Sequence, residues 1–344
     1  MTLTSLSSEE LRKFIADKGL PVYRAKQLLH WIYTAGCGDF NEMLNIPKAL
    51  RCTLAKTTVI RSLRLAARMK STDGTEKNLF SLKDGEFIES VLMFEGSRRT
   101  LCVSTQAGCA MGCKFCLTGS TGFKRNLAAH EIVEQALFTR GRLLPGSDLT
   151  NIVLMGMGEP FENFENVREA LMKFTSPAYL GISKRRITVS TCGNAAGIRE
   201  MGRLGPDVNL AVSLNATTDK VRDKIMPINK RFPISELMAA CREFPLNPHR
   251  KITFEYVMLK DINDTQKDAK RLLRLLNGIP SKVNLIPLNP YAGSRFTRST
   301  DKNILGFQSL LVEGGVEAPI RKSKGADISA ACGQLKNSKI YSEV

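Results

Sequence analysis

The chain has 344 residues, with 50 Lys and Arg against 33 Asp and Glu, so its formal net charge is +17. Its 43% hydrophobic and 24% charged content is typical of a globular protein and excludes a disordered or fibrous chain. No stretch approaches the roughly 18 apolar residues of a membrane span, and the N-terminus lacks the basic-then-apolar pattern of a signal peptide. We therefore expect a cytoplasmic protein with no membrane partner, built as one large domain or as two of unequal size.

The charge and the cysteines narrow the possible functions. The positive excess favours a polyanionic partner such as RNA or DNA, although a merely soluble basic surface has the same composition. An odd number of cysteines, nine, argues against a disulfide framework and favours metal ligation or catalysis. Four of them lie within Cys102–Cys116.

The first part of the chain, residues 1–60, has a helical pattern. Ser7 with Glu10 three positions later is typical of a helix start, and residues 23–33 have apolar side chains at helical spacing. Residues 1–70 hold 12 Lys or Arg and five Asp or Glu, which favours a small accessory RNA-binding module, although a helical cap with a solvated charged face is an equal alternative. Asp-Gly pairs between alternating runs then predict a β-rich extension with hairpins over 61–98.

Residues 99–344 alternate between apolar β-rich runs and helical patterns. This alternation predicts an α/β fold with parallel strands and right-handed crossovers, and six units suit a partial (β/α)6 barrel. The reactive groups of a parallel barrel lie at the carboxyl ends of its strands. The predicted strands are 100–105, 151–156, 186–191, 208–214, 252–259 and 283–288, and the predicted helices between them include 128–140, 164–174, 194–203, 235–244 and 265–277.

The strongest motif is a group of three cysteines in a glycine-rich loop after the first barrel strand. Cys109, Cys113 and Cys116 are close enough in sequence to surround one metal centre, and thiolates select zinc or iron–sulfur clusters. A structural zinc site needs four ligands, whereas this motif supplies three. Three thiolates leave one iron of a four-iron cluster open for a small molecule.

This spacing, with Phe115 before the last cysteine, resembles the radical S-adenosylmethionine (SAM) superfamily. There, three cysteines hold a [4Fe–4S] cluster and SAM chelates the fourth iron. The resemblance narrows to the RlmN/Cfr family of RNA adenosine methyltransferases, and within it the N-terminal module is most similar to the RlmN branch. It is carried by YRAKQLLHWIY (23–33), FIESVLMF (87–94), TLCVSTQAGCAMGCKFCLTG (100–119), NIVLMGMGEP (151–160), ITVSTCG (187–193), LAVSLNATTD (210–219), LIPLNP (285–290) and GADISAACGQL (325–335).

The resemblance implies a set of SAM contacts at the strand ends. The turn after the second strand would bind the SAM amino group, and polar residues after the later strands would complete the site. Each of these residues alone could be an ordinary cap or turn former. One departs from the expected pattern, because Asn215 stands where the family motif has histidine. The implied contacts are Gly158, Glu159, Ser190, Ser213, Leu214, Asn215 and Asn289.

The resemblance also implies a two-stage reaction with two SAM molecules per turnover. Cys332 takes a methyl group from one SAM, and a 5′-deoxyadenosyl radical from the second removes a hydrogen atom from that methyl group. The methylene radical adds to adenine, Glu89 accepts the C2 proton, and Cys102 releases the RNA by a transient disulfide with Cys332. We expect structural roles for the remaining cysteines, Cys37, Cys52, Cys192 and Cys241.

The substrates implied by the resemblance are RNAs. They are one adenosine of 23S rRNA at the peptidyl-transferase centre and the adenosine beside the anticodon in some tRNAs, both methylated at C2. A Cfr-like enzyme would instead methylate C8 of the same rRNA adenosine, and a non-catalytic, metal-stabilised RNA-binding protein is an alternative from another class. Other expected partners are an electron donor such as flavodoxin and a cellular thiol reductant, and we expect a monomer.

Overall fold

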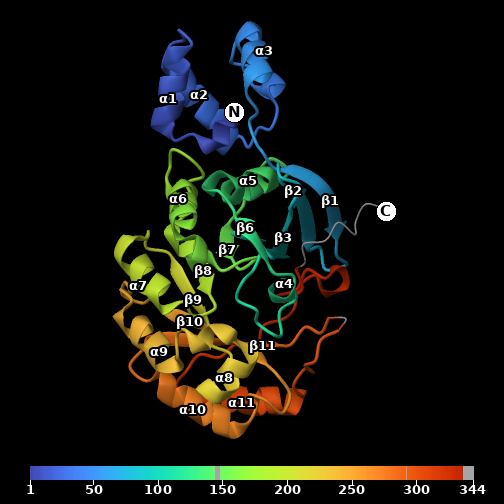
Figure 1. The fold of residues 1–344 in the computed structure, drawn as a ribbon, viewed down its shortest axis with the longest axis vertical. Helices are drawn as coiled ribbons and strands as arrows, with labels where there is room; N and C mark the ends of the chain where they lie inside the picture. Colours follow the sequence, from blue (N-terminus) through green and yellow to red (C-terminus); the bar gives the residue numbers. More distant parts are fainter. Residues whose placement is uncertain (144–147, 292, 336–344) are drawn as a thin grey trace.

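A computed structural model describes residues 1–143, 148–291 and 293–335 (Figure 1). At one end of the molecule stand three helices, α1 (Ser8–Asp17), α2 (Tyr23–Leu29) and α3 (Lys48–Thr57), with a π-helical turn over His30–Thr34. Ser7 caps α1 as predicted, because its hydroxyl accepts from the Glu10 amide at 3.2 Å and its own amide donates to the Glu10 carboxylate at 2.7 Å. The expected apolar face of residues 23–33 is buried in the core.

The β-rich extension consists of β1 (Arg64–Lys70), β2 (Glu76–Ser81) and β3 (Phe87–Glu95), which pair as antiparallel hairpins. Gly74 and Gly85 occupy the two turns with φ of +84° each, a conformation that favours glycine. β3 also pairs antiparallel with β4 (Arg98–Cys102), the first barrel strand. The extension therefore continues the barrel sheet rather than standing beside it.

The barrel has six parallel strands, as the sequence predicts: β4, β7 (Asn151–Leu154), β8 (Ile187–Thr191), β9 (Asn209–Ser213), β10 (Ile252–Met258) and β11 (Ser281–Pro287). They follow one another in chain order, and β11 ends the sheet opposite β1, so the barrel is open. The helices that connect or flank the strands are α5 (Ala129–Arg140), α6 (Phe164–Thr175), α7 (Ala195–Leu204), α8 (Asp219–Ile225), α9 (Ile234–Glu243), α10 (Gln266–Leu276) and α11 (Asp301–Glu313). The predicted fold class is confirmed.

Two smaller pieces complete the mouth of the barrel. A two-stranded sheet of β5 (Gln106–Gly108) and β6 (Phe123–Asn126), with α4 (Leu117–Ser120), frames the three-cysteine loop. The C-terminal segment 325–335 lies beside α4 and the turn between β1 and β2 (Figure 1). Across the described ranges, no helix combines the length and apolar character needed to cross a membrane.

The C-terminal segment is held at several points along its length. Asp327 accepts hydrogen bonds from the Ser71 hydroxyl at 2.6 Å and the Thr72 amide at 3.1 Å, both in the turn between β1 and β2. Nearer its end, the Gly333 carbonyl accepts from the Leu117 amide at 2.7 Å. These contacts place the segment, and Cys332 with it, across the mouth of the barrel.

Candidate active site

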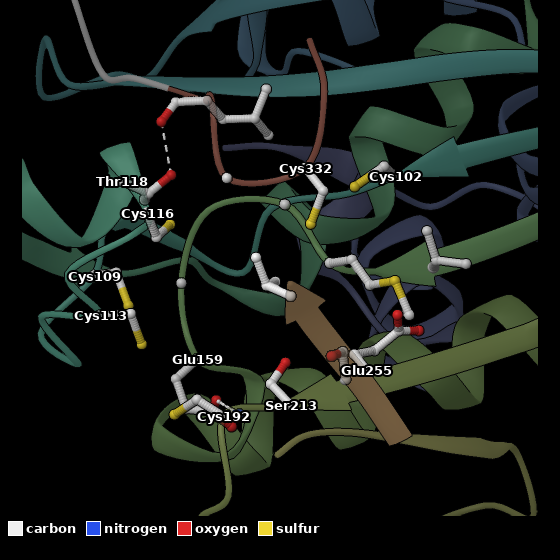
Figure 2. A pocket seen from close by; sticks show the side chains of 18 of the residues that line it. Cys102, Cys109, Cys113, Cys116, Thr118, Glu159, Cys192, Ser213, Glu255 and Cys332 are labelled. Atoms are coloured by element: carbon white, nitrogen blue, oxygen red, sulfur yellow. Dashed lines mark hydrogen bonds between the residues drawn. The ribbon is translucent and has the colours of Figure 1, made fainter. Parts of the chain in front are cut away.

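A cavity of about 1190 Å³, including its open mouth, lies at the carboxyl ends of the parallel strands. This is where a parallel sheet is expected to hold its ligands. Figure 2 shows side chains from the cysteine loop, the strand ends and the C-terminal segment around it. The predicted site residues that line it are Cys102, Cys109, Cys113, Cys116, Gly158, Glu159, Ser190, Ser213, Asn215 and Cys332.

The three-cysteine loop is held by its backbone on one wall of the cavity. The Cys109 amide donates to the Gly122 carbonyl at 2.9 Å. Gly108 has a φ of +77°, and a Cβ there would lie 1.9 Å from the Gly122 oxygen, so the close approach requires glycine. Burial raises the pKa of the Cys109 thiol to about 12 and also raises the pKa values of Cys113 and Cys116. A bound cation is what would favour their thiolate forms.

The turn after β7 places a buried carboxylate beside this loop. Gly158 has a φ of +105°, and a Cβ there would lie 2.6 Å from the Gln106 side chain, so only glycine fits. The carboxylate of Glu159 accepts from the Cys192 amide at 2.7 Å and the Phe161 amide at 3.2 Å. Burial raises the pKa of Glu159, and the hydrogen bonds from Cys192 and Phe161 oppose that rise. These donors fix the carboxylate at the cavity wall.

The ends of β8 and β9 supply the next polar residues. Ser190 and Ser213 line the cavity, whereas Leu214 is buried behind its wall. Asn215 has a φ of 56°, in the left-handed region that Asn adopts more readily than most residues. Its side-chain oxygen accepts from the Val257 amide at 2.8 Å, so this asparagine supports the neighbouring strand β10 as well as lining the cavity.

Cys332 and Cys102 lie side by side at one end of the cavity (Figure 2). Cys332 is exposed on the C-terminal segment, and Cys102 is buried at the end of β4, paired with Val91 of β3. Burial raises the pKa of Cys102 to about 12, with a further contribution from the charge of Cys332. Cys332 is exposed as a residue, but desolvation of its thiol by the surrounding protein raises its pKa to about 11. The nearby Arg321 guanidinium opposes the rise at both thiols. The two thiols therefore share one electrostatic environment.

Glu89 lies on β3 with its side chain fully buried, not in solvent as an isolated edge-strand carboxylate would be. It shares a strand face with Val91, which lines the cavity, because alternate residues of a strand point the same way. Its carboxylate lies 3.3 Å from the Lys77 ammonium, which also donates to the Ser329 carbonyl at 3.3 Å. This buried ion pair joins Glu89 to the segment that carries Cys332.

Asn289 lies beside the C-terminal segment and not in the cavity wall. Its side-chain amide donates to the Cys332 carbonyl at 3.4 Å, and its side-chain oxygen accepts from the Ser323 hydroxyl. Next to it, the Gln334 side chain donates to the Pro290 carbonyl at 2.9 Å. In this structure Asn289 therefore positions the loop around Cys332.

Comparisons with known proteins agree with this arrangement. Residues 1–60 match the family model "Ribosomal RNA large subunit methyltransferase N-terminal domain", and residues 103–275 match the radical SAM superfamily. A protein of Pelobacter propionicus named dual-specificity RNA methyltransferase RlmN is 50% identical over 334 residues, which cover 97% of this chain and 95% of that protein. The chain belongs to the RlmN family.

Other members of the RlmN family are similarly close. The RlmN of Geobacter sulfurreducens is 49% identical over 97% of this chain and 91% of its own length. A crystal structure of a radical SAM methyltransferase from Sphaerobacter thermophilus is 44% identical, with a TM-score of 0.94 over 98% of this chain and 99% of that one. The fold of this RlmN-family chain is therefore that of a radical SAM methyltransferase.

The radical SAM and RlmN assignments imply a [4Fe–4S] cluster and SAM, and the cavity suits both. A closed zinc site holds its ligands about 2.3 Å from one ion. Within the ranges that the structure covers, no three Cys, His, Asp or Glu side chains form such a single-ion group. Cysteines spread along one wall can instead ligate separate irons of a cluster, and Glu159 on the same cavity offers a carboxylate to SAM.

Sequence reasoning on this RlmN-family chain missed three residues of the cavity wall. Cys192, interpreted as structural, lines the cavity, and its amide binds Glu159. Arg321 and Glu255 also line it, with 3.9 Å between the Arg321 guanidinium and the Glu255 carboxylate. Burial raises the pKa of Glu255, which Arg321 opposes. A charged residue inside the apolar run ITFEYVML was the signal available for Glu255, because charged residues are rarely buried without a purpose.

Arg222 of α8 ties together the strand ends of this RlmN-family site. It is fully buried, and its guanidinium donates to the Cys192 carbonyl at 2.7 Å, the Leu214 carbonyl at 3.0 Å and the Asn229 side chain at 3.0 Å. We expect Arg222→Ala to lower the free energy of unfolding by about 3 kcal/mol or more, because it leaves several buried acceptors unpaired. Urea unfolding measures this loss.

The matched control for this change is Arg231→Ala. Arg231 is 59% exposed and pairs with Glu162 at 2.9 Å, so its loss should cost about 1 kcal/mol or less. Equal, small losses of stability in the two variants would contradict the proposed structural role of Arg222.

Proposed function

We propose that this chain methylates C2 of adenosine in 23S rRNA and in a subset of tRNAs, through a methyl group carried on Cys332. The observation that carries the proposal is the convergence of Cys332, Cys102 and the three-cysteine loop on one cavity. The relatives reported above carry the dual-specificity RlmN name, so neither the Cfr-like alternative nor a non-catalytic RNA-binding protein is favoured.

Cys109, Cys113 and Cys116 would hold the cluster. The loop that carries them is framed by β5, β6 and α4, and Cys116 directly precedes α4. When bound, the cluster and SAM would supply the methyl group and the radical chemistry of the reaction. The chain's own part is to hold these groups in a walled cavity beside Cys332.

SAM would lie against the strand ends. Glu159 supplies a carboxylate for its ammonium group, and Gly158 lets the backbone approach closely. Ser190, Ser213 and Asn215 offer polar side chains on the same wall. Leu214 and Asn289 would act by supporting this wall and the Cys332 loop respectively, since the first lies buried behind the wall and the second donates to the Cys332 carbonyl.

The catalytic cycle would use three further groups. The Cys332 thiolate would attack the methyl carbon of one SAM, with S-adenosylhomocysteine as the leaving group, and carry the methyl group as a thioether. Glu89 would accept the C2 proton from the adenine after carbon–carbon bond formation, and its position on the cavity-facing side of β3 supports this role. The Cys102 sulfur would then form a disulfide with Cys332 and release the RNA, which their shared end of the cavity supports.

The remaining partners follow from the same proposal. The basic helical module of residues 1–60 would bind RNA, in line with its match to a ribosomal RNA methyltransferase N-terminal domain. A flavodoxin-like donor would supply electrons, and a cellular thiol would reduce the Cys102–Cys332 disulfide. We further propose that the protein acts as a monomer in the cytoplasm.

Mapping the methyl group on RNA tests the proposed function. The gene is expressed in a strain that lacks C2 methylation, and nucleosides from its 23S rRNA and tRNA are compared with 2-methyladenosine and 8-methyladenosine standards by mass spectrometry. We expect 2-methyladenosine in both RNAs. Finding 8-methyladenosine, or RNA binding with no methylation at all, would overturn the proposal.

A further inference from the structure

Glu255 is a buried carboxylate in the cavity that the proposed cycle does not use. It lies in the middle of β10, in register with Ser213 of β9 and Asn284 of β11. The residue is only 5% exposed, yet its side chain lines the cavity (Figure 2). Both neighbouring strands therefore pair with β10 at Glu255 itself, where the carboxylate faces the cavity.

The two oxygens of Glu255 have different surroundings. Oε1 accepts from the Asn284 side-chain amide at 2.9 Å and lies 3.9 Å from the Arg321 guanidinium. Oε2 is buried and has no hydrogen-bond partner within the described chain. Buried polar atoms are nearly always hydrogen-bonded because leaving one unpaired is costly. An oxygen of this kind in a ligand cavity therefore points to a donor group on the ligand.

The position of Glu255 in the cavity indicates which ligand supplies that hydrogen-bond donor. Figure 2 shows the cluster cysteines on one side and Cys332 and Cys102 on the other. Glu255, Arg321 and Cys332 line the same cavity, and the charges of Glu255 and Arg321 influence the Cys332 thiol. This carboxylate therefore lies on the side of the sulfur that must meet the RNA base. SAM bound to the cluster would instead occupy the side of Cys109 and Glu159.

We infer that Glu255 Oε2 accepts a hydrogen bond from the exocyclic amine of the target adenine and so discriminates adenosine from guanosine and uridine. This inference rests on the proposed function. The adenine amine is a donor, whereas guanine and uracil present a carbonyl oxygen at the equivalent edge. A carboxylate oxygen there attracts the amine and repels those carbonyls. Because C2 and C6, the carbon that bears the amine, are bonded to the same ring nitrogen, a base whose amine binds Glu255 presents C2 on the side of Cys332.

A substrate analogue tests the inference directly. Two short RNA substrates are compared, one with adenosine and one with purine riboside, which lacks only the amine, at the target position. Reconstituted wild-type enzyme should methylate the adenosine RNA roughly 10- to 100-fold faster, the loss expected for one hydrogen bond to a charged group. Glu255→Ala should reduce this ratio to near one. Equal wild-type rates on both RNAs, or an unchanged ratio in Glu255→Ala, would overturn the inference.

Two further measurements separate this role from others. Glu255→Gln keeps the shape of the side chain and one acceptor oxygen, so its ratio of adenosine to purine riboside rates should fall between those of wild type and Glu255→Ala. If the alanine variant does not fold, an unchanged rate ratio in Glu255→Gln overturns the inference. SAM affinity of the reconstituted enzyme without RNA should be unchanged in Glu255→Gln. Weaker SAM binding with a wild-type ratio would assign Oε2 to SAM and overturn it. Failure of the proposed function appears separately, as absent methylation of adenosine RNA by wild type.

Discussion

Cys332→Ala is expected to abolish methylation of RNA while leaving the iron–sulfur cluster intact. The proposed cycle passes the methyl group through the Cys332 sulfur, and no other thiol can replace a group fixed on the segment that crosses the cavity. We expect the rate to fall by roughly 10⁴-fold or more, as when other covalent nucleophiles are removed. Mass spectrometry of methylated nucleosides measures the rate, and the visible absorbance of the anaerobically reconstituted protein reports the cluster.

The matched control is Cys52→Ala, because Cys52 is an exposed cysteine on α3 of the N-terminal helices. It should retain wild-type methylation and the same absorbance. Substantial methylation by Cys332→Ala would remove this residue from the reaction. Loss of the cluster in Cys332→Ala would show instead that the segment serves mainly to hold the cysteine loop.

Cys102→Ala is expected to leave the protein covalently attached to its RNA. Without the second thiol, the thioether between Cys332 and the base cannot be resolved into a disulfide. Cys102 is suited to that step because it lies beside Cys332 at the same end of the cavity. A denaturing gel should show a protein band shifted by RNA, which ribonuclease treatment returns almost to the position of the free protein.

The double variant Cys102→Ala with Cys332→Ala provides the control, since it lacks the sulfur that forms the bond. It should show no shifted band. Free, fully methylated RNA released by Cys102→Ala would contradict the resolving role of this cysteine.

The architecture was predictable because parallel strands carry a local signature. Runs such as NIVLMG and VNLIPL are short, apolar and β-rich, and they alternate with amphipathic helices, so each unit is recognisable by itself. The union of the β-rich extension with the barrel was not predictable in this way. It depends on the pairing of β3 with β4. The hairpin signals in 61–98 are the same whether the extension joins the barrel sheet or forms a separate one.

The parts of the site that residue spacing identifies were predictable from the sequence. The parts that depend on burial in the folded structure were not. The three-cysteine motif and the Gly-Glu turn are local, and the structure brings both to one cavity. Arg222 lies in the helical sequence DKVRDKI, whose charged residues are typical of a solvent-exposed helix. Only the tertiary structure buries Arg222 against the ends of β8 and β9. Asn215 was a departure in sequence, and its left-handed backbone and bond to Val257 explain why an amide fits.

The central claim, that the methyl carbon reaches RNA through Cys332, is tested most directly by isotope counting. The enzyme is first loaded with SAM carrying a fully deuterated methyl group, freed of small molecules, and then given RNA and unlabelled SAM for a single turnover. The account predicts that the new methyl group on adenine C2 retains two deuterium atoms, because one is removed as the methylene radical forms and a proton replaces it when the thioether breaks. A methyl group with all three deuterium atoms, or with none, would contradict it.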